Sequence, residues 1–202
     1  MSSSSLIRLS GLAAVVAGVL LLIGDLLSLA TESENMSESA TTAPHIFTFL
    51  LYLLGSVLVL VGLVGLYVRQ SEAVGVLGLV GFAVAFLGTS LVLGVVWAQL
   101  FVAPFLAVQA PRVLDTEPTG ALALGFTLTF ALLAVGWLLF GVAVLRAQVY
   151  PRAAAIVLMV GAVVNFLPVP LSGIVLDVAI AWLGFILFTG RGEAAQQPSH
   201  MS

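Results

Sequence analysis

The chain consists of long apolar runs separated by short polar stretches, and each run is long enough to form a helix. A helix that crosses the hydrocarbon of a bilayer needs about 20 mostly apolar residues. We therefore predict an all-α fold, a polytopic transmembrane helix bundle. It forms one domain over residues 1–190, and residues 191–202 form a flexible cytoplasmic tail. The six helices are expected at residues 6–30, 44–68, 73–102, 120–145, 153–167 and 171–189.

Polar residues and prolines mark the ends of these runs. Residues 31–42 are expected to form an exposed loop, and residues 69–72 a tight polar turn. Pro44 suits the first turn of the second helix, where its missing N–H leaves no bond unmade. Pro104 and Pro111 are expected to break the third run, because proline removes a helical hydrogen bond.

Two further segments depart from a simple hairpin pattern. Residues 97–118 mix aromatic and polar side chains, which favours an interfacial lid at the level of the headgroups. The fifth run is only about 22 Å long before Pro168 and Pro170 interrupt it. Short or broken segments beside polar groups are where transporters place binding sites. A plain tight hairpin is the alternative.

The first run also has features of a secretory signal peptide. Its start is rich in Ser and carries Arg8, and the small residues Ser28 and Ala30 fit a cleavage site after Ala30. The run is longer, however, than the 7–15 apolar residues of an ordinary signal core. We therefore expect a retained helix, with cleavage as the alternative.

The distribution of Arg predicts the orientation. In a six-span arrangement five of the six Arg residues fall on one side, and only Arg112 falls on the other. By the positive-inside rule the Arg-rich side is cytoplasmic, so both termini are expected there, in a plasma (inner) membrane. The expected topology anchors are Arg8, Arg69, Arg146, Arg152 and Arg191.

Composition narrows the possible functions. Hydrophobic residues make up 61% and charged residues 7% of the chain, so a soluble fold could not cover its surface with polar groups. The net charge is −3 and the chain has no basic cluster, which argues against nucleic acid as a partner. The absence of Cys excludes disulfides and thiolate metal sites. No cofactor and no metal site is predicted.

Polar residues inside the expected spans are the candidates for chemistry. Counting 1.5 Å per residue from the Arg anchors places Asp25, Asn165 and Asp177 at similar heights, about 20 to 25 Å above them. An ionisable residue within a span is costly and usually faces the bundle interior or a wet cavity. Asp177 is the leading candidate, because no basic residue lies at its depth. The predicted intramembrane polar site is Asp177, Asn165, Asp25, Thr89, Ser90 and Thr127, with His45 and Gln99 at its rim.

Structural roles stand beside these functional ones. Asp25 lies near the interface, where water could simply hydrate it. Asp177 could be a protonated residue that is hydrogen-bonded to the backbone or to Asn165. Hydroxyl groups such as that of Thr89 often bond to their own helix backbone. His45 could be an interfacial residue without a ligand.

Small residues recur at four-residue spacing on the first and third expected helices. Such spacing lets helices approach closely in lipid, either within one chain or between chains. The residues are Ser10, Ala14 and Gly18 on the first helix, and Ser90, Gly94 and Ala98 on the third.

The turn between the fourth and fifth expected helices carries a resemblance. It lies within residues 141–161 and contains Arg146, Tyr150, Pro151, Arg152 and Ala153, followed by an apolar helix. This pattern resembles a loose group of bacterial multi-pass integral membrane proteins that have no established activity. The resemblance covers at most the last four helices. It implies a fold of about six helices and a membrane location, and it transfers no functional residue.

Three functions remain open from the sequence. The first is a non-enzymatic accessory or packing protein that associates with itself or with other membrane subunits. The second is a small transporter or channel that uses Asp177, Asn165 and Asp25 beneath the outer lid. The third is a membrane enzyme that acts on lipid or peptide, for which no catalytic motif is visible.

Overall fold

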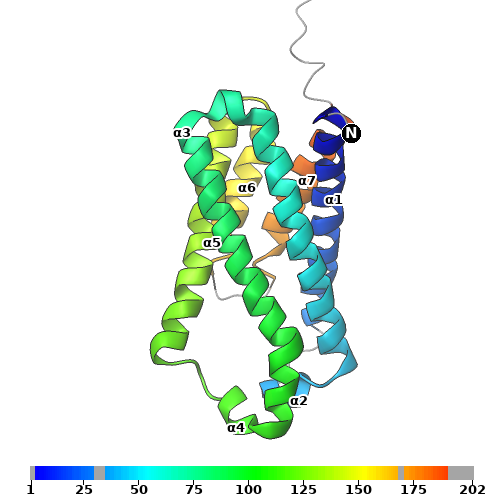
Figure 1. Ribbon diagram of the computed structural model, residues 1–202, viewed down its shortest axis with the longest axis vertical. Coiled ribbons are helices and arrows are strands. Elements are labelled where there is room, and N and C mark those ends of the chain that lie inside the picture. The colour runs from blue at the N-terminus through cyan, green and yellow to red at the C-terminus, as the bar shows by residue number, and fades with distance from the viewer. Residues whose placement is uncertain (1–2, 30–34, 168–170, 191–202) are drawn as a thin grey trace, which may run out of the picture.

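The computed structural model describes residues 3–29, 35–167 and 171–190, and every regular element in them is a helix (Figure 1). The predicted all-α class is therefore confirmed for these residues. Pro168, Pro170, Arg191 and the predicted tail lie outside the described residues. The helices are α1 (Ser3–Ser28), α2 (Met36–Ser39), α3 (Ala43–Gln109), α4 (Pro111–Leu114), α5 (Gly120–Ala147), α6 (Arg152–Val164) and α7 (Ile174–Thr189).

The long element α3 is a hairpin of two antiparallel rods. Its backbone reverses at Gly75, where φ is 54° and ψ is −151°. His45 Nε2 lies 3.3 Å from the carbonyl oxygen of Gln99, although 54 residues separate the two. In a straight helix they would be about 80 Å apart. The two rods correspond to the second and third helices expected from the sequence.

The reversal falls later in the chain than expected. The polar residues 69–72 remain helical, and the chain turns at Gly75 instead. A residue with a Cβ rarely adopts the dihedral angles found there, whereas glycine adopts them readily. Just before and after the turn, the rings of Tyr67 and Phe82 stack with their centroids 4.5 Å apart. The expected tight turn at 69–72 is thus replaced by a single-residue turn.

Pro104 does not break the helix, so that expectation was wrong. The second rod of α3 continues through Pro104 to Gln109. It ends before Pro111, where Ala110 has φ −149° and donates its N–H to the Leu106 carbonyl. A residue that precedes proline is pushed out of the helical region, which explains this end. Of the predicted lid at 97–118, the first half is therefore the end of α3, and only α4 and its neighbours lie outside the rods.

Within the residues that the structure describes, three helices are long and apolar enough to cross a membrane, namely α1, α3 and α5. Their outer surfaces expose many large apolar side chains, such as Leu54, Val76 and Leu128, which suit lipid better than water. By contrast, α6 has 13 residues and α7 has 16, so they are about 20 and 24 Å long. These lengths are shorter than the hydrocarbon thickness of roughly 30 Å. The short pair occupies only part of the bundle's height, next to the Gly75 turn (Figure 1).

Close packing holds α1 between the first rod of α3 and α7. Ala14 of α1 has no exposed surface, and it packs against Gly62 of α3 and Gly184 of α7. A Cβ placed on Gly11 would lie 2.5 Å from Phe188 N, and one on Gly18 would lie 2.5 Å from Asp177 O. The start of α1 is therefore beside the end of α7, and both ends of the described chain lie at the same end of the bundle. The small residues predicted on the first helix therefore pack against other helices of the same chain.

Candidate functional site

A cavity of about 400 Å³ lies inside the bundle, where the end of α6 and the first half of α7 face the other helices. Its walls come from α1, both rods of α3, α5, the end of α6 and the start of α7. Five of the predicted polar residues line it together: Asp25, Thr89, Gln99, Asn165 and Asp177. Polar residues from four separate segments thus converge on one space, which neither composition nor spacing alone required.

A pair of carboxyl groups forms the polar end of the cavity. Asp25 comes from the end of α1, and Asp177 comes from the first turn of α7 and is only 6% exposed. Asp25 Oδ2 lies against Gly173, one helical turn before Asp177, so the two carboxyl groups are close together in the cavity. They are neighbours because α1 and α7 pack closely at Gly18. Among the described residues that line the cavity there is no Lys or Arg.

The two oxygens of Asp25 have different surroundings. Tyr52, from the first rod of α3, donates its hydroxyl to Asp25 Oδ1 at 2.8 Å. Asp25 Oδ2 is buried and has no hydrogen-bond partner among the described residues. A Cβ on Gly173, just before α7, would lie 2.7 Å from Oδ2. Glycine therefore lets the carboxyl group approach the amino end of α7, where the helix dipole favours negative charge.

Asn165 completes this polar end. It caps α6, and its backbone N–H bonds to the Gly161 carbonyl at 2.9 Å. A Cβ on Gly173 would lie 3.5 Å from Asn165 Oδ1, so the amide and the Asp25 carboxyl flank the same glycine. The end of α6 and the start of α7 thus bring an amide and two carboxyl groups to one place.

The rest of the cavity is mainly apolar and aromatic. Trp137 of α5 is 1% exposed and donates its Nε1–H to Thr89 Oγ1 at 3.2 Å. Thr89 in turn donates to the Ala85 carbonyl of its own helix at 2.7 Å. Thr89 therefore lines the cavity and also has the backbone bond that a purely structural role predicts. Phe49, Phe126 and Phe130 supply the other aromatic walls.

The remaining predicted polar residues do not reach this cavity. Ser90 and Thr127 bond to their own helix backbones, at Phe86 and Ala123, and do not line it. His45 is buried, at 4% exposed, but it does not line the cavity either, and its Nε2 lies against the Gln99 carbonyl oxygen.

Tyr52 and Trp137 are site residues that sequence reasoning missed. Both lie within apolar runs, and an aromatic residue there gives no sign of whether it faces lipid or the interior. A tyrosine well inside a predicted span was the one available signal, since a buried hydroxyl usually needs a partner.

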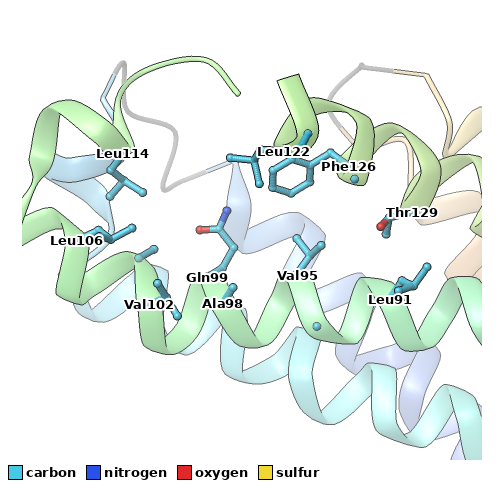
Figure 2. A pocket seen from close by; sticks show the side chains of 14 residues that line it. Leu91, Val95, Ala98, Gln99, Val102, Leu106, Leu114, Leu122, Phe126 and Thr129 are labelled. Carbon is cyan, nitrogen blue, oxygen red and sulfur yellow. The ribbon is translucent and has the colours of Figure 1, made fainter. Parts of the chain in front are cut away.

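A second space, a groove of about 450 Å³ between the second rod of α3 and α5, adjoins the cavity. Figure 2 shows the Gln99 side chain extending into it, with Leu122 and Phe126 opposite. Gln99, Val95 and Phe126 line both spaces, so the groove and the cavity share a wall. Leu122 is 60% exposed, which places the groove at the bundle surface.

At the end of the bundle opposite the Gly75 turn, a contact joins α2 to the residue that follows α4. The Asp115 carboxylate, after α4, accepts bonds from the Ser37 backbone N–H at 2.8 Å and the Ser37 hydroxyl at 2.6 Å. These two bonds lower the pKa of the Asp115 carboxyl below its ordinary value. α2 and α4 are thus held together at the end of the bundle opposite the Gly75 turn (Figure 1).

The predicted topology anchors that the structure describes lie near the other end. Arg8 sits over the Phe188 ring, with its guanidinium carbon 5.7 Å from the ring centroid. Arg69 is near the end of the first rod of α3, close to the turn, Arg146 is in the last turn of α5, and Arg152 begins α6.

Comparison with protein-family models, with curated proteins and with solved structures finds no match. The cavity is therefore the feature from which a function can be inferred. Its distinguishing feature is a pair of carboxyl groups with no basic side chain beside them in the part of the lining that the structure describes.

Proposed function

We propose that this chain is a small transporter in a plasma membrane that binds its solute in the cavity formed by Asp25, Asn165 and Asp177. The observation that supports the proposal is the convergence of these three residues on one space of about 400 Å³. An Asp within a span is costly, and the cost reaches about 2.5–3.5 kcal/mol at the centre on insertion scales. Two Asp residues lie around a space that is large enough for a solute. We infer that binding of the solute offsets the cost of burying them.

The proposed topology is a six-helix bundle with both termini in the cytoplasm. It counts α3 as two spans, and α6 and α7 as a final hairpin that enters from the cytoplasmic side. The Arg residues near the Gly75 end support this orientation through the positive-inside rule. In this arrangement the cavity lies toward the outer half of the membrane, below α2 and α4.

Single cysteines test the orientation, since the chain has none of its own. Ser37→Cys is expected to react with a membrane-impermeant maleimide added to intact cells. Glu72→Cys is expected to react only after the membrane is opened. The opposite pattern would reverse the orientation, and labelling of both sites in intact cells would exclude the topology.

Proton and solute flux into liposomes tests the transport function. Asp177→Asn keeps the shape of the side chain and removes its charge, and we expect it to abolish flux. Glu72→Gln is the matched control, because it makes the same chemical change at an exposed residue near the Gly75 turn. Unchanged flux with Asp177→Asn in folded protein would remove Asp177 from the mechanism.

An accessory role, the first function expected from the sequence, is the second candidate. The surface groove favours it, because Gly94 and Gly125 both line the groove and no atom within 4 Å would meet a Cβ on either. A helix of another subunit could approach closely there. Purification in a gentle detergent tests this role, and a chain that migrates alone with intact flux would argue against it.

A further inference from the structure

We propose that the solute is a lipophilic organic cation with a single positive charge, such as an aryl or alkyl ammonium or phosphonium. We propose further that it enters sideways from the lipid through the groove between α3 and α5, in exchange for a proton. This inference rests on the proposed transport function and names its substrate class and route.

The charge of the lining selects a cation. The titratable side chains that face Asp177 in the cavity are Asp25 from α1 and Tyr52 from α3. α6 contributes only the neutral amide of Asn165 there, and α5 contributes no titratable group. His45 lies behind the wall and is turned toward the Gln99 carbonyl. An anion would therefore meet carboxyl groups without any compensating positive charge.

The apolar walls select an organic cation over an inorganic one. A divalent ion such as Ca²⁺ needs six to eight oxygen ligands, whereas this cavity concentrates its oxygens at one end. Trp137 and three phenylalanines line the cavity. Aromatic rings attract cations and also bury apolar groups. A solute with a charged centre and apolar substituents satisfies both ends of the cavity.

The groove supplies a route from the membrane. It shares Val95, Gln99 and Phe126 with the cavity, so these side chains separate the two spaces. Gly94 and Gly125 keep the groove open, since each would place a Cβ in free space. Gln99 Oε1 is buried without a partner among the described residues, and its amide extends into the groove (Figure 2). It can accept a weak contact from a passing cation.

Proton exchange follows from the pairing of the carboxyl groups. Two neighbouring carboxyl groups in a medium of low dielectric constant do not both carry a charge, so the empty site holds a proton. When a monovalent cation binds, one carboxyl O–H bond breaks and that proton leaves to solvent. The net charge of the site is unchanged, and one proton is exchanged for each cation.

Two ions of the same shape and opposite charge test the substrate class. Binding of tetraphenylphosphonium and of tetraphenylborate to the purified full-length protein is measured by titration calorimetry in micelles. We expect saturable binding of the phosphonium only, with about one proton released per cation when buffers of different ionisation enthalpy are compared. Equal binding of both ions would show simple partitioning into apolar surface and would overturn the proposal.

Variants locate the binding and separate this inference from the transport function. Asp177→Asn and Asp25→Asn are each expected to weaken phosphonium binding at least tenfold, and Glu72→Gln to leave it unchanged. Gly125→Leu is expected to slow association several-fold, because it fills the groove. Proton flux that needs Asp177 without any phosphonium binding would overturn the substrate class alone. If both Asp variants keep their flux and their phosphonium binding, the transport function is overturned as well.

Discussion

A single methyl group at Gly184 is expected to destabilise the bundle, because α1 and α7 touch there. A Cβ on Gly184 would lie 2.6 Å from Ala14 Cβ and 2.8 Å from both Gly11 O and Val15 N. Carbon atoms pack best at about 3.5–4.0 Å, so Gly184→Ala must push the helices apart by roughly 1 Å. Overpacking of this kind costs about 1–3 kcal/mol. Because α1 carries Asp25, the same shift also draws it away from α7 and weakens solute binding.

The assay is reversible unfolding in mixed micelles, followed by circular dichroism, from which the free energy of unfolding is obtained. Gly94→Ala is the matched control, since a Cβ there meets nothing within 4 Å. It is expected to be neutral or slightly stabilising, because Ala favours helix more than Gly does. Adding Ala14→Gly to Gly184→Ala is expected to restore part of the loss by removing the nearest atom. Equal stability of Gly184→Ala and Gly94→Ala would refute the close contact of α1 and α7.

Three further changes probe other parts of the structure. Thr89→Val is expected to cost about 1–3 kcal/mol in the unfolding assay, because it leaves the buried Trp137 Nε1–H without its acceptor. Gly75→Ala is expected to cost about 1–3 kcal/mol through backbone strain alone, as a Cβ there meets no atom within 4 Å. The lowered pKa of Asp115 means that its contact with Ser37 stabilises the loops above the ordinary Asp pKa and is lost as pH falls through the lowered value. The NMR shift of the Ser37 amide is therefore expected to hold from pH 8 to 5 and to move only in more acidic solution, and Asp115→Asn should abolish that titration.

The fold was predictable in outline, because apolar runs of helical length are the strongest signal in a sequence. The exact place of a reversal was not. Residues 69–72 are polar, yet they continue the helix, since nothing prevents a polar last turn from projecting beyond the apolar rods. The chain turns where a backbone without a Cβ permits it, at Gly75, and a glycine in an apolar run rich in glycine carries no visible mark. The break predicted at Pro104 was wrong because a helix packed among other helices tolerates proline in its interior.

The height of each site residue along the bundle could be predicted from the sequence, but the direction in which its side chain points could not. A fixed rise per residue placed Asp25, Asn165 and Asp177 at similar depths, and the structure places them around one cavity. The same calculation gave suitable heights for Ser90 and Thr127, which do not line it. The face that a residue presents depends on how its helix is rotated against its neighbours, and that rotation is set by packing over the whole bundle.

The shortness of α6 determines how large the chamber is. Asn165 marks where α6 stops, and with 13 residues the helix reaches about 20 Å before it gives way to the space below. One added turn would advance that tip by about 5.4 Å and drive apolar side chains into the cavity. The number of residues in α6 thus limits the size of the compartment. A protein of the same fold with a longer α6 would accommodate a smaller ligand, and one with a shorter α6 a larger ligand.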